Sequence, residues 1–210
     1  MKYLFVFVSL LASSYVYGQT DIVSWSSIRL QTKTVNGYRI ALAPIVRHNN
    51  DLSSYANSSL DVIIRKSFGQ GFSAQFLYRH WWMKDSPNRV FWWFDFGHGF
   101  RISDKWRASN RVRWHIAKDY LVDEDPNFIR YLPQARYQLS KKLGFDIGFE
   151  LWLQLDGVAD FRRIRPQTGF TWKINNRMSF SSQYWYEKSI VLDPGFLNHT
   201  INSSLNYTLH

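Results

Sequence analysis

The sequence predicts an all-β protein: a closed antiparallel transmembrane β-barrel of about ten strands, with twelve as the alternative. Three observations predict it: apolar and polar residues alternate over long segments, short turns alternate with longer loops, and the N-terminus is typical of an exported chain. Of the 210 residues 18% are aromatic, 20% are charged and none is cysteine. This composition excludes a disulfide-stapled scaffold, a cysteine-ligated metal protein and a disordered chain.

Residues 1–18 predict a secretory signal peptide, and residues 19–210 the barrel. Met1 and Lys2 give a positive start, residues 3–12 are almost wholly apolar, and residues 13–18 are small and polar. Val16 and Gly18 have the spacing of a signal-peptidase site. The alternative, an N-terminal anchor helix, is disfavoured because a run of about ten apolar residues is too short to span a bilayer.

Two-residue periodicity runs along the whole body of the chain. It is clearest in residues 106–116, where apolar residues take nearly all even positions, and in residues 143–154, where they take the odd ones. Weaker alternation marks residues 60–65, 72–79, 90–97, 129–137, 163–172, 178–187 and 201–209. Because no segment shows a sustained helical period, we interpret the mature chain as all β.

The spacing of turn signals predicts a series of hairpins. Short turns are expected at 35–37, 69–71, 103–105, 140–142 and 175–176, and longer loops at 48–56, 85–88, 119–127, 156–160 and 192–196. Eleven candidate strands result, from 23–33 through 200–209, whereas bacterial barrels have an even number. We therefore expect 23–33 to lie outside the wall, which gives ten strands and places both termini on the periplasmic side.

Strand length and side-chain chemistry favour a membrane barrel over a soluble one. Most predicted strands run to about 11–13 residues, whereas a tilted transmembrane strand needs about 9–11 and soluble strands average about five or six. Large rings occupy one face, and arginine and carboxylate side chains occupy mid-strand positions on the other. A soluble lipocalin-like barrel would place the rings inside. Candidates for interfacial aromatic girdles are Trp81-Trp82, Trp92-Trp93 and Tyr184-Trp185-Tyr186.

The polar strand faces predict a network of charged side chains inside the barrel. Its candidate members are Arg79, Asp95, Arg107, Arg111, Arg113, Gln134, Arg136, Glu150, Arg163 and Arg165, with Asp146, Glu187, Gln138 and Gln167 as further partners. One interpretation is ion pairs and hydrogen bonds that fill a narrow lumen. The alternative is an anion-preferring pore lined by guanidinium groups. Because an unpaired buried charge is expensive, we expect Asp95 to pair with Arg111 or Arg113.

Several short motifs give the chain a family resemblance. They are Trp25, Gly37-Tyr38-Arg39 with Arg47, Tyr78-Arg79, Trp106 leading into Asn110-Arg111-Val112-Arg113, and Arg136-Tyr137. With them the mature chain resembles the family catalogued as domain of unknown function 2490, predicted outer-membrane barrels of Gram-negative bacteria. The resemblance implies this fold and location and supplies no activity. The chain departs from the usual barrel C-terminus, a final aromatic residue, by ending in His210.

The functional expectation is a non-enzymatic structural or interaction barrel in the cell outer membrane. Its expected partners are outer-membrane lipids, lipopolysaccharide and the barrel-assembly machinery, with no nucleic acid, no cofactor, no metal and no catalytic residue. A rim lipid hydrolase that uses His98 near Asp95 is a less favoured alternative, because no Gly-x-Ser-x-Gly or His-Ser pattern accompanies them. The acidic loop at 123–125 is interpreted as solvated, with a divalent-cation site as the alternative.

Overall fold

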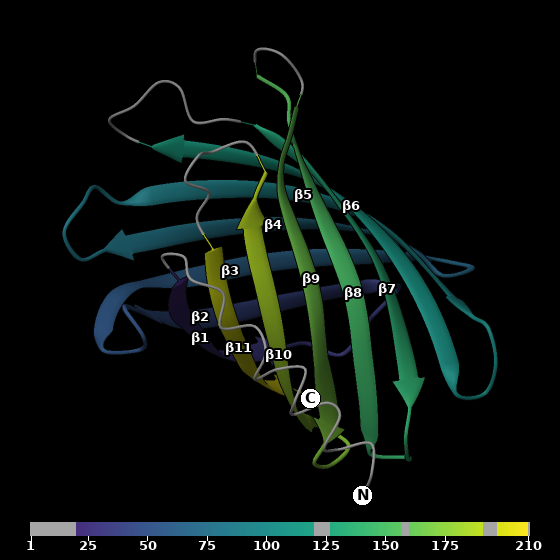
Figure 1. Ribbon diagram of the computed structural model, residues 1–210. Helices are drawn as coiled ribbons and strands as arrows, with labels where there is room; N and C mark the ends of the chain where they lie inside the picture. Colours follow the sequence, from purple (N-terminus) through teal and green to yellow (C-terminus); the bar gives the residue numbers. More distant parts are fainter. Residues whose placement is uncertain (1–19, 120–126, 157–159, 191–196, 210) are drawn as a thin grey trace, which may run out of the picture.

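The protein forms a single closed β-barrel in the computed structural model, which describes residues 20–119, 127–156, 160–190 and 197–209 (Figure 1). The predicted signal peptide at 1–18 and the acidic loop at 123–125 lie outside the described residues. The strands are β1 (Thr20–Gln31), β2 (Tyr38–Asn49), β3 (Ser54–Gly69), β4 (Phe72–Met83), β5 (Arg89–Arg101), β6 (Trp106–Asp119), β7 (Phe128–Gln138), β8 (Leu143–Gln154), β9 (Asp160–Lys173), β10 (Met178–Ser189) and β11 (Leu197–Thr208). No helix in this described part of the chain is long and apolar enough to cross a membrane.

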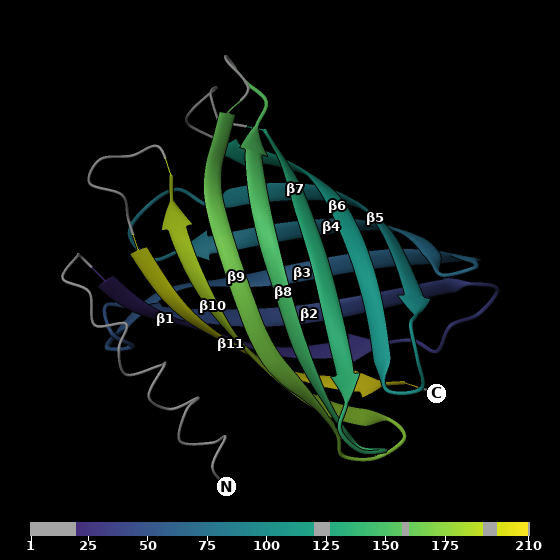
Figure 2. The same ribbon diagram turned by 45° about the vertical axis from the view of Figure 1, so that its right-hand side comes forward.

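Each strand pairs with its neighbours in the chain, and β1 closes the barrel against β11. The all-β closed barrel predicted from the alternation is therefore confirmed. All the pairs between consecutive strands are antiparallel, from β1–β2 to β10–β11. The strands tilt strongly around the barrel, as the two views in Figures 1 and 2 show.

The expected count of ten strands is wrong, because β1 belongs to the wall. An up-and-down chain of eleven strands brings its first and last strands together in the same direction, and β1 accordingly pairs with β11 in parallel over its whole length (Figure 2). Thr20 therefore lies beside Leu197, and Thr208 beside Gln31. The two ends of the described barrel are thus on opposite sides, which also contradicts the expectation that both termini lie on one side.

The parallel closure predicts a specific disulfide, because Ser26 is the direct partner of Ser203. The chain has no cysteine, so a Ser26→Cys/Ser203→Cys variant contains no competing thiol. Paired Cα atoms on neighbouring strands are close enough for a disulfide, and we expect the folded variant to oxidise intramolecularly. A control pair, Ser24→Cys/Leu205→Cys, is displaced by four residues, roughly 13 Å along the strands, and should stay reduced. A crosslink in the control pair alone would refute this register.

Two kinds of connection distinguish the two ends of the barrel. The connections at residues 32–37, 70–71, 102–105, 139–142 and 174–177 define what we call the turn end, and the opposite end, where Thr20 lies, is the loop end. The tightest hairpins have positive φ at both central residues, as the twist of a β-hairpin favours: 50° and 82° at Asn36-Gly37, and 47° and 83° at Gln70-Gly71. Gly71 must be glycine for a second reason, since a Cβ there would lie 1.9 Å from the carbonyl oxygen of Gly99.

The barrel is apolar outside and largely polar inside. Outward positions carry exposed rings and aliphatic chains, with Phe96 66% exposed and Trp114 46% exposed. Inward positions on the same strands carry buried charges, with Asp95 6% and Arg113 7% exposed. A soluble barrel has the opposite arrangement, with apolar side chains inside. The distribution of apolar and polar side chains in this barrel is therefore inverted.

Register corrects the assignment of aromatic residues to interfacial girdles. Trp82, Trp92 and Tyr184 face outward, but Trp81, Trp93 and Trp185 have the opposite parity and line the lumen. Trp25 and Trp152 line it as well. The sequence predicts most aromatic rings on the outer face. Because neighbouring residues of a strand point to opposite faces, one member of each adjacent aromatic pair points inward instead.

Candidate functional site

The lumen contains a cavity of about 820 Å³ that is lined by residues of all eleven strands. In the described part of the chain, nine arginines line it against four acidic residues, so this wall carries a clear positive excess. The arginines are Arg29, Arg47, Arg65, Arg79, Arg111, Arg113, Arg130, Arg163 and Arg165, and the acids are Asp61, Asp95, Glu150 and Glu187. The inside of the barrel is thus the chemically distinctive part of the molecule.

The two sides of the lumen differ in character. Strands β2 to β5 contribute a buried apolar cluster of Ala41, Ile63, Leu77, Phe91 and Trp93. Strands β6 to β10 contribute most of the charges. Placing charges against a low-dielectric wall strengthens their mutual interactions and raises the cost of leaving any of them unpaired.

Among the described side chains, three ion pairs join an aspartate to the arginine directly opposite it on the next strand. They are Asp61–Arg79 and Asp95–Arg113, each with N–O distances of 2.6 and 2.7 Å, and Asp146–Arg136, with 2.6 and 3.1 Å. Each pair is bidentate, which is the strongest and most directional arrangement available to an arginine and a carboxylate. Asp95 therefore pairs with Arg113, one of the two partners expected for it, and also accepts from the Gln75 amide at 3.1 Å.

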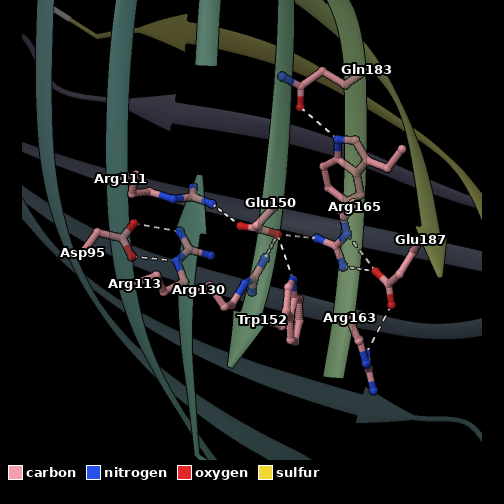
Figure 3. Close-up of polar contacts among 11 residues, drawn as sticks. Asp95, Arg111, Arg113, Arg130, Glu150, Trp152, Arg163, Arg165, Gln183 and Glu187 are labelled. Carbon is pink, nitrogen blue, oxygen red and sulfur yellow. Dashed lines mark hydrogen bonds and ion pairs between the residues drawn. The ribbon is translucent and has the colours of Figure 1, made fainter. Parts of the chain in front are cut away.

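Glu150 on β8 is the centre of the charged network (Figure 3). Its carboxylate accepts from Arg111 at 2.7 Å, Arg130 at 2.7 Å and Arg165 at 3.1 Å, which come from β6, β7 and β9. The Trp152 indole NH donates to it at 3.1 Å. Glu150 is only 1% exposed, and its two carboxylate oxygens accept hydrogen bonds from four side chains.

Glu187 on β10 extends this network toward the chain's last strands. It accepts from Arg163 at 3.2 Å and from the Nε of Arg165 at 2.7 Å, and Arg165 also contacts it through Nη2 (Figure 3). Arg165 therefore bridges two buried carboxylates. The charged network is therefore continuous from β6 to β10.

Tryptophan and arginine side chains form a closed ring of contacts around the lumen, which we call the Trp–Arg ring. Its members in order are Trp25, Arg79, Trp93, Arg130, Trp152, Arg165 and Trp185. Each guanidinium carbon lies 3.8–5.8 Å from the centre of a neighbouring indole, and Trp185 contacts Trp25 at 6.4 Å. These distances are within the range of cation–π interactions, which are stronger where the cation is desolvated.

The Trp–Arg ring and the ion pairs share the same arginines. Arg79, Arg130 and Arg165 each contact both a carboxylate and an indole face. Every ring member lies in the half of its strand nearer the loop end. The lumen is therefore crowded with paired charges and indoles in the loop-end half.

The turn-end half of the lumen contains two predicted members of the network that stand apart from the ring. Arg107 and Arg136 line a second cavity of about 520 Å³, together with Gln134. Arg136 pairs with Asp146, whereas Arg107 has no ion pair within the described residues. All ten network residues predicted from the sequence thus line one of the two cavities.

Sequence reasoning missed several residues of the site. Asp61 and Arg130 stand on the polar faces of their strands but were not chosen, and the signal that identifies them is the same alternation that identified Arg79 and Arg136. Trp152 stands at an even position of residues 143–154, on the face that otherwise carries polar residues. Its inward position follows directly from the register of β8 with β7 and β9.

The structure separates His98 from Asp95, the residues of the hydrolase alternative. Asp95 points into the lumen, where it pairs with Arg113. His98 stacks at 4.2 Å on Phe72 and contacts Phe100 at 5.6 Å, both of which are exposed on the outer face. The two side chains therefore point to opposite faces of β5, although both residues border the main lumen cavity. The described residues also contain no group of three or more carboxylate or imidazole side chains that would hold a metal ion.

Some buried polar nitrogens of the lumen have no hydrogen-bond partner among the described residues. The Nε atoms of Arg29, Arg47 and Arg111 are buried without a hydrogen-bond partner in the described structure, as are both ring nitrogens of His115. His115 is enclosed by the rings of Phe91, Trp93, Phe128 and Trp152, at centroid distances of 5.3–6.0 Å. Unsatisfied donors in a positively charged cavity favour water or anions as occupants.

No protein-family model, curated protein or solved structure matches this chain. The resemblance to domain of unknown function 2490 therefore stays a prediction, and the class that the fold and site define is a closed eleven-stranded barrel with a charged, arginine-rich interior.

Proposed function

We propose that this chain is an outer-membrane β-barrel protein of a structural or binding type, exported by its N-terminal signal peptide, with a lumen sealed by paired charges. The single observation that carries the proposal is the inverted distribution of side chains. Strands of 11 to 16 residues expose rings to the outside while Glu150, Asp95 and Asp146 are buried inside. An apolar exterior of this kind suits lipid, and a closed sheet leaves no unpaired strand edge within it.

The short turns support one orientation in the membrane. In outer-membrane barrels short turns face the periplasm and longer loops face outward, so we assign the turn end to the periplasm. Expected contacts of the outer surface are outer-membrane lipids and lipopolysaccharide, and insertion would use the barrel-assembly machinery. Nothing in this proposal requires a cofactor, a metal or a nucleic acid.

A second candidate function is a small anion-preferring pore, which is favoured by nine lumen arginines against four acids. The sealed lumen is preferred because seven of these nine arginines contact a carboxylate or an indole ring in or beside the Trp–Arg ring. Paired guanidinium groups hold their positions and obstruct a lumen, whereas a conducting pore needs binding that is weak enough to release the ion.

The experiment that tests the proposal uses the mature chain refolded in detergent and inserted into lipid vesicles. We expect heat-modifiable gel mobility, protection of the strands from protease, and no steady conductance above that of the lipid in planar bilayers. Recovery as a soluble monomer that does not enter vesicles would contradict the membrane assignment. Stable anion-selective current steps from heat-modifiable protein would instead select the pore.

A further inference from the structure

The cavity at the turn end is a second compartment of the barrel, outside the Trp–Arg ring. It has a volume of about 520 Å³ and shares Arg65, Gly99, Ser109 and Gln134 with the main lumen cavity. Both cavities therefore meet at these residues. Room for the compartment comes partly from Gly99, whose Cβ, if present, would lie 3.8 Å from its nearest neighbours. Packing does not demand glycine at this position, so its small size leaves open space.

The described side chains do not balance the charges in this compartment. Of the described residues, four arginines line it, Arg65, Arg101, Arg107 and Arg136, together with one acid, Asp146. Asp146 is 2% exposed, and both of its carboxylate oxygens are taken by Arg136. The remaining three guanidinium groups therefore have no carboxylate among the described residues that line the cavity.

The neighbours of these three arginines leave donors available. Arg65 donates to the neutral hydroxyl of Ser73 at 3.1 Å. Arg101 pairs at 2.7 Å with Asp104, a turn residue whose side chain is 95% exposed, so this pair is largely screened by water. Arg107 has no ion pair in the described structure. Deeper in the lumen, the buried Nε of Arg111 and of Arg29 also lack an acceptor.

The outer rim of the turn end has the same sign of charge as the cavity. Six exposed basic residues surround the described turns, against Asp104 as the acidic residue of those turns. They are Lys33, Lys105, Lys141, Lys142, Lys173 and Arg177. The described parts of the loop end expose Asp51, Asp85 and Asp156 together with Lys84 and Lys188, so charges of both signs occur there. A positive rim that leads into a positive recess concentrates anions at that mouth.

We propose that the turn-end compartment is a binding site for the phosphate groups of a multiply charged ligand, held by Arg65, Arg101 and Arg107. Guanidinium groups present planar pairs of donors that match phosphate oxygens, and several around one recess suit a ligand with more than one negative charge. Ser109 and Gln134 add neutral hydrogen-bonding groups beside them. The phosphate belongs either to a lipid headgroup at the membrane surface or to a soluble phosphate ester.

This inference rests on the proposed barrel function and adds a ligand class to it. The site is reached from the turn end, so a ligand does not have to pass the Trp–Arg ring. The probe is inorganic pyrophosphate, titrated calorimetrically into the refolded full mature chain in phosphatidylcholine vesicles permeable to the probe. Heat-modifiable mobility of the same sample shows independently that the barrel has formed. If the unmodified protein forms the barrel but does not bind pyrophosphate, the proposed site is refuted and the proposed barrel function still stands.

Three variants make the test specific. Arg107→Gln is expected to weaken pyrophosphate binding about tenfold, the effect of losing one charge-assisted contact. Gly99→Leu keeps every arginine and fills the recess, and should weaken binding at least as much. The matched control Lys141→Gln removes one positive charge from the rim outside both cavities and should change binding less than about twofold.

The outcomes also identify the source of the phosphate. Pyrophosphate binding that disappears when phosphatidylglycerol is added to the vesicles assigns the site to a lipid headgroup, and binding that persists assigns it to a soluble ester. Equal weakening by Arg107→Gln and Lys141→Gln would show that only net charge matters. That result, or full binding by Gly99→Leu, would refute the site.

Discussion

Glu150→Ala is expected to lower the free energy of unfolding by about 3–5 kcal/mol, because it breaks several buried ion pairs at once. The reason is that one carboxylate serves Arg111, Arg130 and Arg165, and two of these, Arg130 and Arg165, have side chains only 7% and 12% exposed. Arg165 keeps Glu187 as a partner, but Arg130 has no other carboxylate in the described structure. Its charge would be left buried and unmatched.

Urea titration of the refolded protein, followed by tryptophan fluorescence, measures this effect. Glu150→Gln preserves the shape and one acceptor oxygen while removing the charge, so a destabilisation close to that of Glu150→Ala would show that the charge is decisive. Asp104→Ala is the matched control, because the Arg101–Asp104 pair is exposed and should contribute about 1 kcal/mol or less. An unchanged midpoint for Glu150→Ala would mean that water and ions fill the lumen and screen the arginines.

Strand positions and faces could be predicted because the two-residue period is a local property of the chain. Residues 143–154 were predicted as one strand, and β8 spans the same residues. Turns at 35–37 and 69–71 were predicted from their glycines, and the positive φ angles there show why glycine is needed. Such features depend only on the residues within one hairpin.

The closure of the barrel could not be predicted, because it depends on strands at the two ends of the chain. Nothing local to β1 shows that it lies beside β11, about 177 residues away, as the Gln31–Thr208 hydrogen bond records. The even-number rule for bacterial barrels led to ten strands, and the parallel pairing of β1 with β11 is the arrangement that the rule does not anticipate.

The ion pairs divide in the same way between local and distant contacts. Asp95 and Arg113 lie opposite each other across one turn, so their pairing follows from hairpin register. The Arg111–Glu150 contact passes over β7 and joins residues 39 positions apart, which requires the curvature of the closed barrel. The Trp–Arg ring is equally non-local, since Trp25 on β1 contacts Arg79 on β4 across the two intervening strands β2 and β3.

Asp95→Ala is expected to lower the free energy of unfolding by roughly 2–5 kcal/mol, because it leaves Arg113 buried against the Trp93 ring without a carboxylate. The same reasoning predicts that removing both charges costs much less than removing one. In Asp95→Leu/Arg113→Leu the buried charge is gone and apolar side chains face the neighbouring apolar cluster, so we expect the double variant to recover at least half of the loss caused by Asp95→Ala.

This double-variant comparison separates a filled lumen from a wet one. In a dry, packed lumen the unmatched charge dominates, and the coupling between positions 95 and 113 should exceed about 1.5 kcal/mol. In a wide aqueous pore each substitution would act alone, with effects near the surface value of about 1 kcal/mol or less, as expected for the exposed Arg101–Asp104 pair. Small, additive effects at Asp95 and Arg113, together with anion conductance, would therefore reject the sealed lumen. In a sealed lumen the two charges depend on each other energetically, and ions do not pass.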